Sequence, residues 1–406
     1  MSGNASECLV VQHDCPVKGR LPEGTPTVAV IGAGQLARMM QPAAVHLGIQ
    51  LRVLASSADE CAAAVIPDVL IGAADDMDAL SALCDGVAAL TVEHEHVRSD
   101  ALDQLSARTA VHPSGAALSY ARDKAALRER LAELGHPQPR WQIVAAADDA
   151  ASFAEQVSWP IVLKPSRGGY DGRGVFVVDD AASAVEVMAQ DLPAGAVWLA
   201  EEFVAFAREV AMQVVVSPQG QAVSYPLVQT VQRDGMCAEV VAPCPHSSDE
   251  LQHQAAVLAL SIASELAVVG ALAVEMYVVD TGGGETLLVN EIAMRPHNSG
   301  HWSIEGAVTS QFENHLRAVL NLPLGDPRAR QPYAVMVNII GGLADNLHYA
   351  LLHCQARDPQ AKIHIYGKEV RPGRKLGHVT VCGSNLEELL ERARHAAAYM
   401  RGDIDE

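Results

Sequence analysis

Two glutamates flank a glycine turn in the second half of the chain. Glu275 and Glu291 lie on either side of residues 281–284, each within an apolar run that predicts a β-strand. In a hairpin the two carboxylates would face each other, and they repel unless a cation lies between them. Mg²⁺ binds few carboxylates and completes its shell with water and phosphate oxygens. The pair therefore predicts a metal held on a nucleotide, with Asn290 as a further oxygen donor; two solvated glutamates are the alternative.

A second motif joins a lysine to a glycine-rich loop. Lys164 ends a predicted strand, and residues 165–174 include four glycines before the next strand begins. Glycine loses much conformational entropy on folding, so this clustering indicates a special requirement on the backbone. The N–H donors of a mobile loop can fold over a polyphosphate, while the ammonium group reaches a phosphate oxygen. The spacing differs from the Walker A motif, and a flexible hairpin is the alternative.

Two polar clusters follow the predicted hairpin. Residues 295–302 read Arg-Pro-His-Asn-Ser-Gly-His-Trp, and Arg295 can donate two hydrogen bonds to a planar oxyanion. Residues 368–375 hold four basic side chains in a chain of net charge −20, so their local field would attract a phosphate monoester. The alternatives are a polar loop that satisfies its own backbone and a solvated basic turn.

The N-terminal region carries a dinucleotide-type motif. Residues 32–37, Gly-Ala-Gly-Gln-Leu-Ala, follow a predicted strand and open a helix whose N–H groups could face an anion or polar ligand. The full fingerprint needs an acidic residue at the end of the second strand, and Asp59 comes too late. This disfavours an NAD-dependent oxidoreductase; a turn without a ligand is also open. Glu93 and Glu95 follow another strand, at the edge where open sheets bind ligands.

The pattern around these motifs predicts a tail and three parts. Residues 1–24 are expected to form a flexible tail, and residues 25–117 alternate strands and helices as in a doubly wound α/β domain. Residues 118–328 begin with a helix over 118–135 and continue as an α+β region of many strands with a long helix over 249–269. Residues 329–406 are expected to form a small, β-rich C-terminal domain.

Composition excludes several classes of protein. The chain has 406 residues, of which 49% are hydrophobic and 19% charged, as expected for folded domains rather than disorder. The excess of 49 acidic over 29 basic residues argues against binding a long nucleic acid. No apolar run approaches the roughly 18 residues of a membrane helix. Eight scattered cysteines without a C-x-x-C pair indicate free thiols in a reducing, cytoplasmic compartment.

Taken in order, the motifs resemble those of the ATP-grasp ligases, and among them the N5-carboxyaminoimidazole ribonucleotide synthetases of purine biosynthesis. The similar stretches extend from about residue 27 to residue 383 and include T-V-E-H-E-H-V, G-G-Y-D-G-R-G, V-N-E-I-A, R-P-H-N-S-G-H-W and V-R-P-G-R-K-L-G-H. The resemblance implies a pre-ATP-grasp domain, an ATP-grasp domain with ATP between its halves, and a small C-terminal domain. It also implies a homodimer.

Matched position by position, the resemblance implies three sets of site residues. Those expected to bind ATP are Lys124, Lys164, Gly169, Tyr170, Asp171, Gly172, Arg173, Gly174, Glu201, Glu202, Phe203, Val204, Glu209, Gln232, Asn290 and Glu291. Those expected to bind the second substrate are Gln35, Leu36, Glu93, Asp171, Arg295, His297, Asn298, Lys368, Arg371, Arg374 and Lys375. The metal ligands are Glu275 and Glu291, and the catalytic roles fall to Lys164, Asp171 and Arg295.

The implied activity is the ATP-dependent carboxylation of 5-aminoimidazole ribonucleotide by bicarbonate. It would proceed through carboxyphosphate to N5-carboxyaminoimidazole ribonucleotide, ADP and phosphate, with Mg²⁺ or Mn²⁺ as the metal. Lys124 stands where the family usually has arginine, which keeps the charge but loses the bidentate geometry. The rivals are a formate-using glycinamide ribonucleotide transformylase and a non-catalytic nucleotide-binding protein; the intact glutamate pair and Lys164 disfavour the second.

Overall fold

A parallel sheet forms the N-terminal part of the protein. The computed structural model describes residues 10–11, 24–169, 174–344 and 346–405. The sheet has the order β4 (Asp68–Ile71), β3 (Gln50–Ala55), β2 (Thr27–Ile31), β5 (Ala89–Val92) and β6 (Ala110–Val111). Both faces are covered by helices, which explains why the strands read as continuous apolar runs. The predicted doubly wound unit is confirmed, with its switch point between β2 and β5.

Helices from two parts of the chain cover this sheet. One face, around Val28 and Val30, packs on α1 (Gln35–Leu47) and on the more distant α10 (Gln311–Val319). The other face, around Ala29 and Ile31, packs on α2 (Met77–Leu83) and α3 (Ser99–Ser106). Because α10 belongs to the central part, the two parts share a hydrophobic core.

The predicted helix over residues 118–135 is two helices. They are α4 (Gly115–Arg122) and α5 (Lys124–Glu133), and Asp123 lies between them in an extended conformation. The Asp123 carboxylate accepts hydrogen bonds from the N–H groups of Ala125 and Ala126 and pairs with Arg167 at 2.6 Å. The prediction of one helix was wrong because a short acidic side chain caps a new helix instead of continuing the old one.

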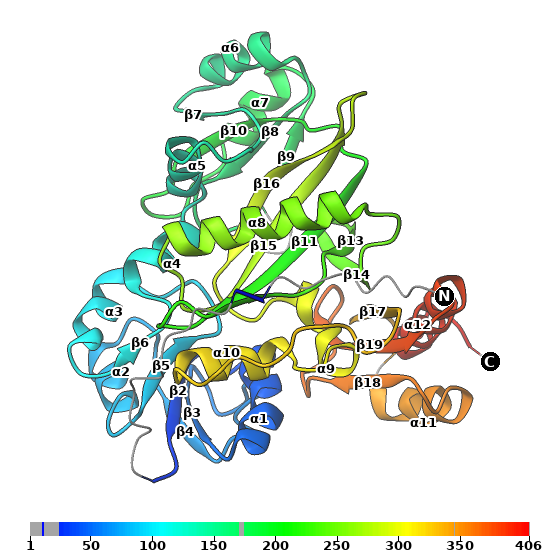
Figure 1. Ribbon diagram of the computed structural model, residues 1–406. Helices are drawn as coiled ribbons and strands as arrows, with labels where there is room; N and C mark the ends of the chain where they lie inside the picture. The colour runs from blue at the N-terminus through cyan, green and yellow to red at the C-terminus, as the bar shows by residue number, and fades with distance from the viewer. Residues whose placement is uncertain (1–9, 12–23, 170–173, 345, 406) are drawn as a thin grey trace.

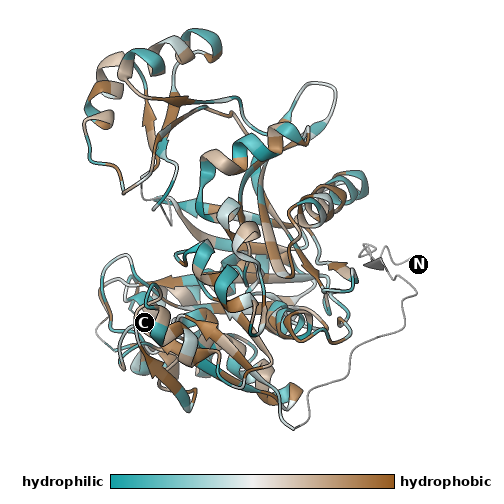
Figure 2. Ribbon diagram, turned by 90° about the vertical axis from the view of Figure 1, so that its left-hand side faces the viewer, coloured by the Kyte–Doolittle hydropathy of each residue, from teal (hydrophilic) through white to brown (hydrophobic). Residues whose placement is uncertain are grey.

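A small antiparallel sheet forms a separate lobe at the top of Figure 1. Its strands have the order β7 (Trp141–Val144), β10 (Trp198–Glu202), β8 (Ile161–Pro165) and β9 (Phe176–Val178). Helices α6 (Ala147–Val157) and α7 (Ala181–Met188) pack on one face around Phe153. The strands of this lobe are mainly hydrophobic, whereas its helices mix hydrophobic and hydrophilic residues (Figure 2).

A large antiparallel sheet joins the central and C-terminal parts. Its main order is β1 (Val10–Val11), β12 (Ala222–Ser224), β11 (Arg208–Val216), β13 (Val228–Arg233), β14 (Met236–Ala242), β17 (Tyr333–Ile340), β19 (Lys375–Gly383) and β18 (Lys362–Ile365). The hairpin of β15 (Gly270–Asp280) and β16 (Glu285–Ala293) joins it at β11. The C-terminal strands thus continue the central sheet through the β14–β17 pairing.

Helices cover the large sheet unequally. Helix α8 (Asp249–Glu265) packs on the face of β11 and β15 that holds Val210 and Val274. Helices α11 (Leu347–Arg357) and α12 (Leu386–Arg401) cover the C-terminal strands. The short α9 (Ser303–Gly306) and the 3₁₀ turn at Asn298–Gly300 lie between these regions. None of the helices that the structure describes is both long and apolar enough to span a bilayer.

Candidate active site

The two facing glutamates lie on the β15–β16 hairpin. Glu275 pairs directly with Glu291, which confirms the predicted juxtaposition. The turn, however, pairs Asp280 with Glu285, and a bulge shifts the register between Glu275 and Met276. Without that extra residue Glu275 would face Asn290. The bulge therefore places the second carboxylate opposite the first, a common use of bulges beside active sites.

The surroundings of this pair favour protonation while no cation is present. Burial, followed by the charges of Glu291 and Glu209, raises the pKa of Glu275 to about 8. Burial and then the charge of Glu291 raise the pKa of Glu209 to about 7. Lys124 Nζ lies 4.0 Å from the Glu291 carboxylate. His297 Nε2 lies 3.3 Å from Glu275, but burial followed by Arg295 lowers the pKa of this imidazole to about 3.

The donor set fits a hard divalent cation bound together with phosphate. Carboxylate oxygens are preferred Mg²⁺ ligands, and two of them leave positions for water and phosphate. A positive ion would also relieve the repulsion that raises the pKa of Glu275. The residues present therefore fit the metal that the sequence predicts.

In the metal-free protein we expect Glu275 to contribute stability that is lost as the pH rises toward 8. Between 4.5 and 8 the folded state holds a proton on Glu275 that the unfolded state releases, so the free energy of unfolding falls with pH. Buried histidines such as His297 act in the opposite direction, because their pKa is lowered in the folded state and the unfolded state still binds protons on them near pH 6.5. The difference in melting temperature between the parent and a variant without this carboxyl, measured across pH 6.5–8, isolates the contribution of Glu275.

Glu275→Gln should remove the fall in stability that this carboxyl causes across that range, because the amide does not titrate. The matched control is Glu285→Gln, the same chemical change at the turn end of the neighbouring strand, outside both cavities described below. The control should keep the slope of the parent protein. An equal slope in Glu275→Gln would contradict the assignment of the proton to this carboxyl.

A cavity of about 510 Å³ opens between the small lobe and the large sheet. It gathers residues from β8, β10, β11, β13, β15 and β16. Among its lining residues are eleven that the sequence predicts for ATP and metal, namely Lys124, Lys164, Glu201, Glu202, Phe203, Val204, Glu209, Gln232, Asn290, Glu291 and Glu275. Its size lies within the range of small-molecule sites.

Lys164 lies in the cavity wall as part of a buried ionic network. Its Nζ is 2.6 Å from one oxygen of Glu201, and Nε of Arg128 is 2.7 Å from the other. The same guanidinium donates to the carbonyl oxygens of Val289 and Asn290, both at 2.8 Å. Burial alone would raise the pKa of Glu201, but Arg128 and Lys164 outweigh it and lower that pKa to about 2. The network thus ties the small lobe to β16.

A second cavity, of about 300 Å³, lies beside the carboxyl ends of β2 and β5. The predicted substrate residues that line it are Gln35, Leu36, Glu93, Arg295, His297, Asn298 and Lys375. Gly169, predicted for ATP, also lines it. Arg295 Nε is 2.8 Å from Glu95, so the arginine is held by an acid from the other part of the chain.

The glycine turn of residues 32–37 binds a side chain of its own chain. The Glu93 carboxylate accepts hydrogen bonds from the N–H groups of Gly34 at 2.7 Å and Ala37 at 2.9 Å. A Cβ atom on Gly34 would collide with this carboxylate, which explains the glycine. The prediction that these N–H groups face a ligand was therefore wrong for Gly34 and Ala37. Their N–H groups bind the Glu93 carboxylate in the position where an anionic ligand was expected.

The two cavities share part of their walls. Lys124, Glu291, His297, Asn298 and Lys375 line both. A group transferred from a ligand in one cavity to a ligand in the other would pass these side chains. The lysine that replaces the family arginine lies at this boundary.

The four basic residues of the cluster 368–375 do not all lie at the cavities. Lys375 lines both cavities, and Lys368 Nζ donates to Gln35 at 2.5 Å, which brings it to the edge of the second cavity. Arg371 pairs with the exposed Glu369 at 2.6 Å. Arg374 donates to the Glu369 carbonyl at 3.3 Å. Neither arginine lines the described cavities.

Sequence reasoning missed several residues of the site. Phe206 and Tyr277 stack with ring centroids 4.8 Å apart, and the other missed lining residues of the first cavity include Val162, Val175, Val177 and Cys237. Those of the second include His94, His96, Arg122 and His301. Period-2 alternation beside Lys164 could have indicated the valines. Tyr170, Asp171, Gly172 and Arg173 lie outside the described residues, and Gly174 is described but lines neither cavity.

Three family models match the chain in succession. The ribonucleotide synthetase preATP-grasp domain matches residues 25–122, and the ATP-grasp domain matches residues 129–312. The phosphoribosylaminoimidazole carboxylase C-terminal domain matches residues 334–392.

Known proteins are similar to this chain over most of its length. The chain is 49% identical to the N5-carboxyaminoimidazole ribonucleotide synthase of Mycobacterium bovis, over 92% of this chain and 88% of the relative. Two solved structures of the Aspergillus clavatus enzyme, one with ATP and one with ADP and 5-aminoimidazole ribonucleotide, are 33% and 32% identical. Both have TM-scores of 0.84 and cover 93% and 94% of this chain, and 98% and 99% of their own chains. The chain therefore belongs to the N5-carboxyaminoimidazole ribonucleotide synthase family of ATP-grasp enzymes.

Proposed function

We propose that the protein carboxylates 5-aminoimidazole ribonucleotide at its exocyclic amine, using bicarbonate and ATP. The products are N5-carboxyaminoimidazole ribonucleotide, ADP and phosphate, as a step of purine biosynthesis. The observation that carries this proposal is the shared wall of the two cavities, where Glu291, His297 and Lys375 face both. The Aspergillus relative solved with ADP and the ribonucleotide supports one ligand for each cavity.

The proposed reaction has two steps. An oxygen of bicarbonate attacks the γ-phosphorus of ATP, and the bond to the bridging oxygen breaks, giving carboxyphosphate and ADP. Carboxyphosphate then releases phosphate as its carboxyl carbon, in the form of CO₂, is taken up by the amine. The amine proton leaves to the departing phosphate or to a side chain. Lys164, Arg295 and Lys375 supply positive charge to the phosphoryl group as it transfers.

Magnesium completes this proposal. Glu275 and Glu291 would hold Mg²⁺, with Mn²⁺ as an alternative, and Asn290 could add an oxygen. When bound, the ion stabilises negative charge that develops on the phosphate oxygens. The Glu275 side chain is 18% exposed and so partly shielded from water, whereas that of Glu291 is 45% exposed and open to water and phosphate.

A coupled assay of ADP release tests the reaction. Purified protein is supplied with MgATP, bicarbonate and 5-aminoimidazole ribonucleotide, and each is omitted in turn. Full turnover should need all three. Replacing bicarbonate and the ribonucleotide by formate and glycinamide ribonucleotide should give no stimulation; stimulation by that pair would reject the proposal in favour of a formate-using transformylase.

Lys368→Met should raise the KM for 5-aminoimidazole ribonucleotide about tenfold. Loss of one charge-assisted hydrogen bond weakens binding by roughly 1.5 kcal/mol, and the ammonium group lies beside Gln35 of the second cavity. The dissociation constant for ADP should stay unchanged. Lys362→Met, an exposed lysine on β18, is the control. A weaker ADP complex with an unchanged KM would reassign the basic cluster to the nucleotide.

We also propose a homodimer that works in the cytoplasm. Family resemblance supports the dimer, and the free thiols among the described cysteines support a reducing compartment. Light scattering of the purified protein should give twice the mass of one 43.0 kDa chain. A monomer at micromolar concentration would overturn the dimer.

A further inference from the structure

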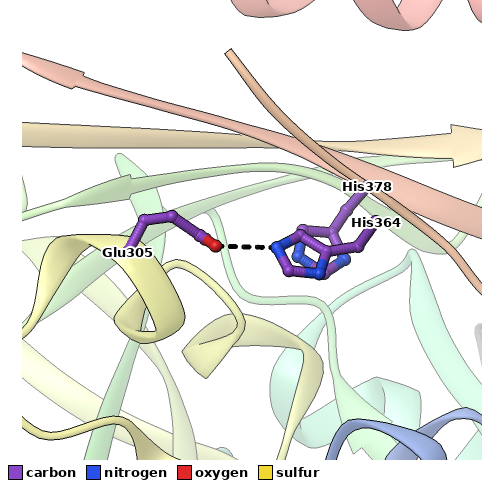
Figure 3. A group of neighbouring side chains, drawn as sticks. All are labelled: Glu305, His364 and His378. Carbon is purple, nitrogen blue, oxygen red and sulfur yellow. Dashed lines mark hydrogen bonds and ion pairs between the residues drawn. The ribbon is translucent and has the colours of Figure 1, made fainter. Parts of the chain in front are cut away.

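We propose that Glu305, His364 and His378 form a second metal site, which binds a divalent transition-metal ion such as Zn²⁺. Glu305 lies on α9, His364 on β18 and His378 on β19 (Figure 3). One ligand atom from each lies within 4.8 Å of the other two. The cluster is separate from the Glu275/Glu291 pair and lines neither cavity.

Two atoms of the cluster are buried without a hydrogen-bond partner among the described residues. They are Nε2 of His378, whose side chain is fully buried, and Oε2 of Glu305. The other carboxylate oxygen lies 2.8 Å from Nε2 of His364. A buried polar atom without a partner costs about 1–3 kcal/mol. A cation bound between these groups would satisfy both atoms at once.

Tyr366 orients His378 so that one ring nitrogen remains available to a metal ion. The Tyr366 hydroxyl lies 2.8 Å from Nδ1 of His378, so this nitrogen is already held and Nε2 remains for an ion. Metal-bound histidines usually have such a partner on the other ring nitrogen. Burial, followed by the neighbouring His364 and His301, lowers the pKa of His378 well below its usual value, and the neutral imidazole is the form that binds metals.

The donor set indicates the kind of ion. Two imidazoles and one carboxylate are a common three-residue zinc set that leaves the fourth position for water. Mg²⁺ prefers oxygen ligands and would be held poorly here. Around tetrahedral Zn²⁺ the ligand atoms must close to about 3.3 Å. The rings of His364 and His378 lie nearly parallel, at 14°, so one must turn, and the side chain of His364, 29% exposed, has room to do so.

The ion would connect two segments that line the substrate cavity. Helix α9 follows the loop of residues 295–302, and β19 begins at Lys375. The ring of His301, which lines the second cavity, lies 5.1 Å from the ring of His378. A metal at this place would hold both segments in a fixed relation behind the substrate.

Cobalt titration of tag-free, chelator-treated protein tests the site. Excess Mg²⁺ and ADP keep the Glu275/Glu291 pair occupied. We expect one equivalent of Co²⁺ to produce the strong visible absorption of a four- or five-coordinate ion with nitrogen ligands, and Zn²⁺ to displace it. Only the weak absorption of octahedral Co²⁺ would overturn the proposal, since it indicates oxygen ligands.

Variants locate the bound ion. His364→Gln and Glu305→Gln, both at partly exposed positions, should abolish the absorption while circular dichroism stays unchanged. Tyr366→Phe should weaken Co²⁺ binding about 10- to 100-fold, as expected for an outer partner of a ligand. His253→Gln, at an exposed position on α8, should bind as the parent does. Unchanged binding in His364→Gln or Glu305→Gln would place the ion elsewhere and overturn the assignment.

Discussion

Glu291→Gln should lower the rate of ADP release about 100- to 1,000-fold while the protein stays folded. The change removes one of two facing carboxylates and with it the charge that, in the proposed function, would hold the metal against the nucleotide. Metal ions contribute several kcal/mol to phosphoryl transfer, and each 1.36 kcal/mol corresponds to a factor of about ten in rate. The rate should be measured at saturating ATP, with a titration of Mg²⁺ beside it.

The same variant should be slightly more stable than the parent when no metal is present. After burial, the charge of Glu291 is the largest cause of the raised pKa of Glu275, so removing it relieves a repulsion within the folded state. Lower activity with equal or higher stability is the mark of a functional carboxylate. Glu285→Gln, on the same strand, should retain activity. A Glu291→Gln protein that turns over ATP normally would remove the metal from this hairpin.

The sequence was sufficient for the parts of the site that lie close together in the chain. The glutamate pair and Lys164 are recognisable because strand periodicity and a glycine turn fix their neighbours within a few residues. Residues 25–117 alternate clearly between apolar strands and helices, so the doubly wound unit could be predicted. Family resemblance then extended the prediction to residues whose local pattern carries no signal, such as Gln232.

What could not be predicted depends on contacts between distant segments. The bulge near Glu275 determines which residue faces it, and a one-residue shift cannot be read from the turn. The Glu93 carboxylate accepts a hydrogen bond from the N–H group of Gly34, 59 residues away in the chain. The continuation of the central sheet into β17 pairs two strands that no short-range pattern connects. Each of these features is determined by tertiary packing rather than by the secondary-structure propensity of the local sequence.

Arg128 is the most important residue that the sequence did not indicate, and its replacement should have the largest effect on stability. Helical periodicity gives no reason to single out an arginine on α5, yet its side chain is only 1% exposed. We expect Arg128→Met to lower the free energy of unfolding by about 3–5 kcal/mol, because it leaves Glu201 short of a partner and frees two backbone carbonyls. Urea denaturation of the metal-free protein measures this. A loss below about 1 kcal/mol would contradict the network.

Comparison of Arg128→Met with Lys164→Met distinguishes stabilisation of the fold from ligand binding. Both cations contact the Glu201 carboxylate, but only Lys164 lines the first cavity, which we propose binds the nucleotide. Lys164→Met should therefore weaken ADP binding more than Arg128→Met does, although each variant leaves Glu201 with one cationic partner. Removing the carboxylate as well, in Arg128→Met with Glu201→Gln, should cost less than the sum of the single changes, because both single changes break the same ion pair between Arg128 and Glu201. Additive losses would mean that the two side chains stabilise the fold independently. In that case the network would not couple the small lobe to β16 through Glu201.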